Sequence, residues 1–101
     1  MILITGATGY LGRALGETLV RRGHAVRALV RPGSESRAPR GAELALGDAL
    51  QPDSVTAAAL DCHTLVHLIG TPHPASWKQR QFEQIDRASL FASVEAAIRQ
   101  Q

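Results

Sequence analysis

The first twelve residues constrain the fold of this chain more than any other segment. A short apolar run, Ile2–Thr5, leads directly into three glycines, Gly6, Gly9 and Gly12, spaced three residues apart. Glycine permits a tight turn out of a strand, leaves room for a ligand against the backbone, and lets the next helix pack closely. The unpaired N–H groups and the dipole at the start of that helix stabilise negative charge. The segment therefore predicts a strand, a phosphate-binding turn and a helix.

The rest of the chain alternates apolar runs typical of buried strands with segments of helical periodicity. Strands are predicted at residues 25–30, 42–46 and 64–69. Helices are predicted at 10–22, 52–60 and 77–99, and loops at 32–40 and 70–76. Such alternation demands a parallel sheet with right-handed crossovers. We therefore expect a three-layer α/β Rossmann-like domain of about four strands in the order 3-2-1-4, which ends before a fifth strand.

Composition narrows the classes of function. At 101 residues the chain forms at most one domain, and its net charge of +2 is too small and too scattered to indicate nucleic-acid binding. The single cysteine, Cys62, rules out an intrachain disulfide, and no carboxylate–histidine cluster has the spacing of metal ligands. No apolar run approaches the roughly 18 residues that span a bilayer. Without a basic leader at the N-terminus, we expect a cytoplasmic protein with no membrane partner.

The glycine-rich segment, written Thr-Gly-Ala-Thr-Gly-Tyr-Leu-Gly from Thr5 to Gly12, closely resembles the short-chain dehydrogenase/reductase superfamily. Within it the chain is most similar to the extended and atypical branch of NAD(P)-dependent epimerase/dehydratase-like proteins. The resemblance covers residues 1–101 and implies an NAD(P)-binding Rossmann domain that forms the N-terminal part of a longer family domain. It implies that the cofactor pyrophosphate lies against Gly6, Thr8, Gly9, Tyr10, Leu11 and Gly12.

The end of the second predicted strand carries Arg31, where an acidic residue would accept a hydrogen bond from the ribose 2′-hydroxyl. An arginine there can pair instead with a 2′-phosphate, so NADP is favoured and NAD stays possible. Arg13 follows the last glycine and either joins this phosphate site, as in NADP-using relatives, or lies on the solvated face of the helix. Arg37 and Arg40 belong to the following loop and are expected to be exposed.

The resemblance also implies adenine and ribose contacts further along the chain. Asp48 follows the third predicted strand and would accept from the adenine amine, aided by the N–H of Ala49. Its alternative role is that of a turn or helix-capping aspartate. The end of the fourth strand, Leu68, Ile69 and Gly70, would border the inner ribose through its backbone.

Catalytic residues are not found in this chain. The Tyr-x-x-x-Lys pair of the resembled family is missing, since Tyr10 lies in the glycine loop and Lys78 does not follow a tyrosine by four. The resemblance thus implies the dinucleotide-binding part of an oxidoreductase, epimerase or dehydratase. A non-catalytic nucleotide-binding or scaffold module of the same fold is the alternative, and whether the chain is itself an enzyme stays open.

Two apolar features predict self-association. The fourth strand would be an unpaired edge of the sheet. The last helix would carry an apolar stripe of Phe82, Ile85, Phe91, Val94 and Ile98.

Overall fold

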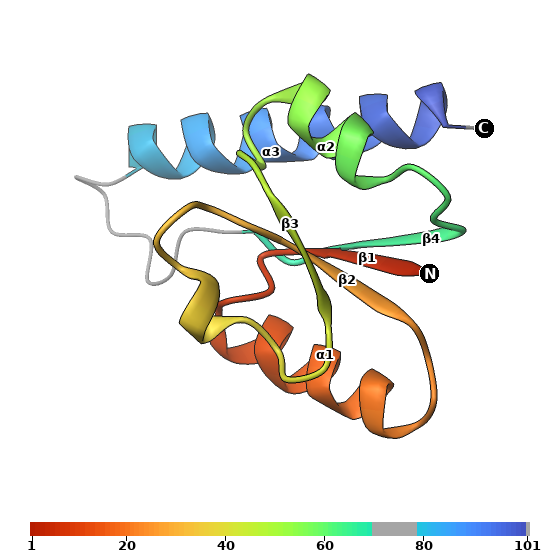
Figure 1. Ribbon diagram of the computed structural model, residues 1–101. Helices are drawn as coiled ribbons and strands as arrows, with labels where there is room; N and C mark the ends of the chain where they lie inside the picture. Colours follow the sequence, from red (N-terminus) through yellow and green to blue (C-terminus); the bar gives the residue numbers. More distant parts are fainter. Residues whose placement is uncertain (70–78, 101) are drawn as a thin grey trace.

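The computed structural model describes residues 1–69 and 79–100, and the side chains of the last helix from Arg87 onward. The expected alternation of strands and helices is present in this part of the chain (Figure 1). In chain order the elements are β1 (Ile2–Thr5), α1 (Tyr10–Arg21), β2 (Val26–Val30), the short 3-10 helix η1 (Glu35–Arg37), β3 (Glu43–Leu46), α2 (Pro52–Ala58), β4 (Thr64–His67) and α3 (Gln79–Arg99).

The four strands form one parallel sheet in the order β3-β2-β1-β4, as the sequence predicted. In the central strand Ile4 pairs with Ala28 of β2 on one side and with Val66 of β4 on the other. Helix α1 covers one face of the sheet, and α2 and α3 cover the opposite face (Figure 1). This three-layer arrangement brings the carboxyl ends of all four strands to the same edge of the sheet.

The core lies on both faces of the sheet because successive side chains of a strand point in opposite directions. Leu3 and Ile4 are neighbours in β1 and both are fully buried, yet they belong to separate clusters. Leu3 packs with Val55 of α2 and with alanines of α3, whereas Ile4 packs with Val30 and the rest of the α1 side. Burial on both faces explains why the first three residues of β1 are apolar, while the buried hydroxyl of Thr5 lies 3.1 Å from His67 Nδ1.

Several element ends differ from the predicted ones. Strand β4 ends at His67, before the predicted end at residue 69. Helix α2 ends at Ala58, before the predicted end at residue 60, and three residues later Asp61 has a positive φ of 64°. The predicted loop at 32–40 contains η1. Trp77, the predicted start of the last helix, lies outside the described residues.

From Arg87 onward the buried face of α3 consists of small residues, which differs from the prediction of an apolar stripe of large side chains on this helix. Ser89, Ala92, Ser93 and Ala96 are buried against the sheet and α2. Small side chains let a helix approach its neighbours closely, so the large apolar residues turn outward. Three members of the predicted stripe, Phe91, Val94 and Ile98, are exposed, while the side chains of Phe82 and Ile85 lie outside the described part.

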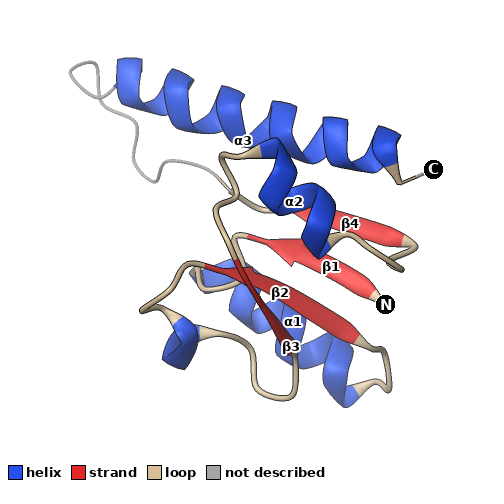
Figure 2. Cartoon of the chain, turned by 45° about the horizontal axis from the view of Figure 1, so that its top comes forward, coloured by secondary structure: helices blue, strands red, loops and turns tan. Residues whose placement is uncertain are grey.

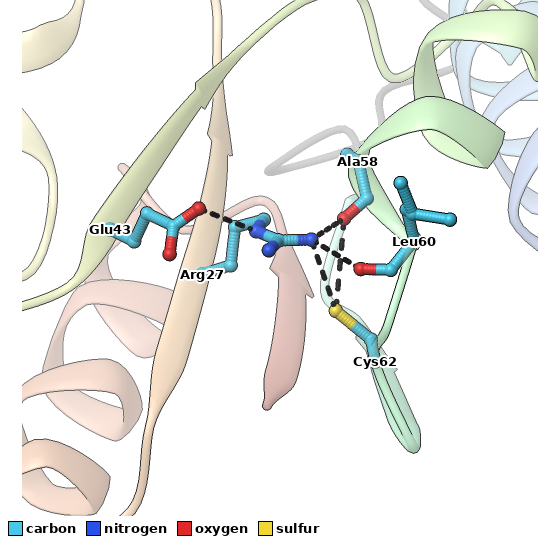
Figure 3. A network of polar contacts seen from close by, with 5 residues as sticks. All are labelled: Arg27, Glu43, Ala58, Leu60 and Cys62. Carbon is cyan, nitrogen blue, oxygen red and sulfur yellow. Dashed lines mark hydrogen bonds and ion pairs between the residues drawn. The ribbon is translucent and has the colours of Figure 1, made fainter.

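A partly buried arginine connects three elements at the amino end of the sheet (Figure 3). Arg27 of β2 donates from Nη1 to the backbone oxygens of Ala58 and Leu60, both at 2.7 Å, and from Nε to Glu43 Oε1 of β3 at 3.0 Å. Only 16% of its side chain is exposed. The same Nη1 lies 3.5 Å from Cys62 Sγ. Arg27 thus supplies positive charge at the carboxyl end of α2, where helix carbonyls lack partners.

Candidate functional site

The loops that follow β1, β2 and β3 lie at the carboxyl edge of the sheet together with Leu68 and Ile69, which follow β4 (Figure 2). This edge is where open α/β sheets bind their ligands. A cavity of about 220 Å³ opens between these loops. Its lining residues are Gly6, Thr8, Leu29, Val30, Arg31, Ser34, Arg37, Gly47, Ala49, Leu50 and Ile69.

Two of the three glycines in the loop after β1 are required by the protein itself. Gly6 has a φ of +75°, and a Cβ there would lie 2.5 Å from the backbone oxygen of Leu68. Gly12 is buried in the first turn of α1, and its Cβ would lie 2.1 Å from the backbone oxygen of Gly6. Both distances are too short for any side chain. Gly6 and Gly12 therefore allow β1, α1 and the end of β4 to pack together.

Gly9 has no such structural requirement. It is the N-cap of α1 with φ −76° and ψ 171°, an extended conformation that any residue adopts. A Cβ at Gly9 would meet only the backbone oxygen of Gly6, at 3.4 Å, which is an ordinary contact. The space beside Gly9 is therefore open, and a side chain there would fill it.

The start of α1 is suited to an anion. No side chain caps the helix, and no acidic residue occupies its first turn. Tyr10 is 96% exposed and Leu11 is also exposed, so these two residues present backbone to the loop while their side chains point to solvent. The N–H groups of a helix's first turn have no partner within the helix and attract negative charge. A phosphate group fits this open, uncapped turn.

The two arginines predicted to read a 2′-phosphate lie in different surroundings. Arg31 lines the cavity at the end of β2. Arg13 is not among the residues that line it, and its Nε lies 3.7 Å from Glu17 Oε1, one helical turn along α1. In this structure Arg13 therefore shows the helix-surface arrangement that the sequence analysis kept open.

The two residues after β3 that were predicted to contact the adenine, Asp48 and Ala49, line two different cavities. Ala49 lines the first cavity, whereas Asp48 lines an adjoining one together with Arg31, Pro32 and Ser54. One carboxylate oxygen of Asp48, Oδ1, accepts a hydrogen bond from the backbone N–H of Leu50 at 2.9 Å. That bond fixes the turn and leaves the other oxygen of the carboxylate for a different donor.

The end of β4 also reaches the cavity. Ile69 lines it, and Leu68 is held against β1 because its N–H donates to the backbone oxygen of Thr5 at 3.0 Å. Gly70 lies outside the described residues. Below this segment, His67 Nδ1 lies 3.1 Å from both Thr5 Oγ1 and Ser93 Oγ, so a polar link joins β1, β4 and α3 next to the cavity.

Six of the lining residues were not predicted as cofactor contacts: Leu29, Val30, Ser34, Arg37, Gly47 and Leu50. Arg37 is exposed, as predicted from the sequence, and it also lines the cavity. The Pro32-Gly33 pair was the available signal, because such a pair predicts a turn that folds the following residues back on the strand.

Among the side chains described here, no three of His, Cys, Asp and Glu are arranged to hold a metal ion. No helix in the described ranges is both long and apolar enough to cross a membrane.

Comparisons with known proteins identify the family and the fold of the chain. The model of the NAD dependent epimerase/dehydratase family matches residues 2–100 of the chain. A curated relative is divinyl chlorophyllide a 8-vinyl-reductase, chloroplastic, of Oryza sativa subsp. indica. It is 47% identical over 47 residues, which make up 46% of this chain and 12% of the reductase.

Solved structures share the fold along nearly the whole chain. The crystal structure of gox2253 matches with a TM-score of 0.69 at 36% identity, covering 95% of this chain and 31% of that one. A short-chain dehydrogenase/reductase superfamily protein from Agrobacterium tumefaciens, solved with bound NAD, gives 0.68 at 26% identity, covering 95% of this chain and 29% of that one. The chain therefore spans less than a third of either structure.

Proposed function

Because this chain belongs to the NAD-dependent epimerase/dehydratase family, we propose that its glycine loop binds the pyrophosphate of a nicotinamide dinucleotide. The observation that carries the proposal is Gly9. The fold accounts for glycine at Gly6 and Gly12 but not at Gly9, where a side chain would be tolerated by the protein and would occupy the space beside an uncapped helix start. A pyrophosphate in that space accounts for the glycine.

The remaining parts of the cofactor follow the cavities outward from the loop. We propose that Thr8, Tyr10 and Leu11 complete the pyrophosphate cradle, the last two through their backbone. Arg31 would pair with the 2′-phosphate of NADP, which makes NADP the preferred cofactor over NAD, with Arg13 as a second candidate for that group. The adenine would lie near Asp48 and Ala49, and the inner ribose near Leu68, Ile69 and Gly70.

We propose that residues 1–101 act as the dinucleotide-binding part of an oxidoreductase, epimerase or dehydratase. Family membership and the partial coverage of the solved relatives support this proposal. The bound nicotinamide would supply hydride transfer, and the chain's own residues would hold and orient the adenosine half. A non-catalytic nucleotide-binding module is the second candidate, which a reading frame extending beyond Gln101 to a Tyr-x-x-x-Lys pair would argue against. A cytoplasmic location stays a prediction from the sequence.

Calorimetric titration of this chain with NADPH, and separately with NADH, tests the proposal. We expect both to bind, with NADPH several-fold tighter. A folded chain that binds neither would overturn the proposal that residues 1–101 hold the cofactor.

We also propose that the chain self-associates through the outer face of α3 or through β4, the edge strand of the described sheet. Phe91 and Ile98, about two helical turns apart, are 66% and 62% exposed on that face, and Val94 between them is 47% exposed, so large apolar side chains form an exposed stripe. Sedimentation velocity should show a dimer or larger species that Phe91→Ser weakens. Leu60→Ser, a change of an exposed leucine two residues after α2, is the control. A monomer at high protein concentration would contradict this proposal.

A further inference from the structure

Strand β3 is the outer strand of the described sheet on the side of β2 (Figure 2). Along such a strand the backbone groups of successive residues alternate between the neighbouring strand and the free edge. The N–H of Gly47, just after β3, donates to the oxygen of Val30 at 3.0 Å, so every second residue counted back from Gly47 faces β2. The N–H and C=O groups of Leu44 and Leu46 therefore point to the free edge. Within the described part of the chain, no other segment is hydrogen-bonded to these groups.

The side chains of the same two leucines are also exposed. Leu44 and Leu46 are 42% and 59% exposed. They pair with Ala28 and Val30 of β2, which belong to the cluster on the α1 face of the sheet. The segment that connects β2 to β3 contains only the short helix η1, so β3 receives little cover on this face. Each leucine thus offers both a backbone edge and an apolar side chain to a neighbouring molecule.

Strand β3 has none of the usual protections of an edge strand. Natural proteins block such edges with lysine, proline or a bulge. The four residues of β3, Glu-Leu-Ala-Leu, include neither lysine nor proline, and they pair with β2 without a bulge. The one charged residue, Glu43, accepts a hydrogen bond from Arg27 Nε at 3.0 Å, so its charge is balanced within the chain. A second strand would therefore meet no unbalanced charge along β3.

The pattern of β3 is complementary to itself. If two copies are related by a two-fold axis at Ala45, their β3 strands are antiparallel and Leu44 of each copy lies opposite Leu46 of the other. Both leucines direct their N–H and C=O groups to the free edge, so each such pair exchanges both of its N–H···O bonds. Their side chains meet on the same face of the sheet. Glu43 lies opposite Gly47 of the other copy, so like charges do not face each other.

We propose that two copies of this chain join their sheets through antiparallel β3 strands centred on Ala45. This interface is separate from the outer face of α3 and from β4, and it does not depend on the proposed dinucleotide function. A contact between strands of four residues buries less than the roughly 1,200 Å² of a stable complex, so the dimer is weak. We expect a dissociation constant on the order of 100 µM.

Sedimentation equilibrium between about 20 µM and about 1 mM tests the proposal, with Phe91→Ser present throughout to weaken association through α3. Leu44→Lys/Leu46→Lys places like charges in each cross-strand pair, whereas Leu44→Glu/Leu46→Lys places opposite charges there. We expect the like-charge variant to lose dimerisation and the opposite-charge variant to keep its dissociation constant within about threefold. Leu60→Lys, a change of a 57% exposed leucine outside the sheet, should have no effect. Circular dichroism checks that all variants fold.

The outcomes separate this proposal from the proposed function. A Phe91→Ser chain that stays monomeric to about 1 mM overturns the proposal and leaves the β3 edge to a strand of another protein. Equal dimerisation of the two double variants overturns the pairing of Leu44 with Leu46. Neither leucine lines the cavities after β1, β2 and β3, so both double variants should bind NADPH as the native chain does. A chain that dimerises as expected but binds no dinucleotide would overturn only the proposed function.

Discussion

The glycine loop makes a quantitative prediction, because two glycines of one motif should respond in opposite ways to substitution. In Gly12→Ala the new Cβ would lie 2.1 Å from the backbone oxygen of Gly6, with the Cα of Ala7 also at 2.9 Å. The obstacles are backbone atoms of a turn fixed by Gly6, so the upper end of the usual overpacking cost applies, about 3 kcal/mol. Alanine regains about 1 kcal/mol of helix propensity. We expect the free energy of unfolding to fall by about 2 kcal/mol.

In Gly9→Val the balance is reversed. The extended backbone at Gly9 accepts a β-branched residue, and the only neighbour of the Cβ is the oxygen of Gly6 at 3.4 Å. Replacing glycine at an N-cap by an apolar residue costs up to about 1 kcal/mol. The isopropyl group would, however, occupy the space proposed for the pyrophosphate. We therefore expect nearly native stability together with loss of NADPH binding.

Urea unfolding followed by circular dichroism measures the first quantity, and calorimetric titration with NADPH measures the second. Gly12→Ala should lower the free energy of unfolding, whereas Gly9→Val should lower the affinity for NADPH. Normal NADPH binding by Gly9→Val would refute the assignment of the open space to phosphate. An unchanged unfolding free energy in Gly12→Ala would refute the argument that this glycine is required for close packing.

Two further predictions concern the amino end of the sheet. Arg27→Met removes the hydrogen bonds to the oxygens of Ala58 and Leu60, so we expect the free energy of unfolding measured in urea to fall by about 2 kcal/mol. The affinity for NADPH should not change. Arg22→Met, a change of an exposed arginine, is the control. An equal effect of both changes would contradict the role of Arg27. Burial raises the pKa of the Cys62 thiol, although the nearby Arg27 lowers it in part. A raised pKa in the folded state means that the stability contributed by the neutral thiol is present at neutral pH and is lost as pH rises above the ordinary thiol range. As the pH rises above the ordinary thiol range, the free energy of unfolding should therefore fall more steeply for the native chain than for Cys62→Ala. Parallel curves for the two proteins would contradict the raised pKa of Cys62.

The strand order and the layers could be predicted from the sequence because local patterns determine them. Apolar runs buried on both faces, such as 2–5, leave little choice but a parallel sheet. The spacing of the glycines predicted a tight turn at Gly6 and close helix packing at Gly12, and the short distances from a Cβ at either position agree with both reasons. The carboxyl edge of the sheet was likewise predictable, since it follows from parallel connections.

The outward orientation of Phe91, Val94 and Ile98 on α3 and the position of Arg37 beside the cavity could be predicted only in part, for different physical reasons. Periodicity predicted that Phe91, Val94 and Ile98 share one face of α3. It could not predict whether this face or the face of small residues packs against the sheet. Close approach of α3 selected the small residues instead. Arg37 reaches the cavity only through two turns in succession, and a composition of prolines, glycine and serines indicates a loop without its path.

The small-residue face of α3 has a consequence for local opening. Alanine and serine bury little apolar area, so the part of α3 whose side chains are described, from Arg87 onward, gains little hydrophobic free energy from docking on the sheet. Its described attachments are largely polar and peripheral, with Arg99 Nη1 donating to Asp53 at 3.0 Å and Gln100 Nε2 donating to the oxygen of Thr56 at 2.9 Å. The central strand β1 is buried on both faces by larger side chains. Amide hydrogens of α3 should thus exchange through a low-energy detachment of the helix, while those of β1 require global unfolding.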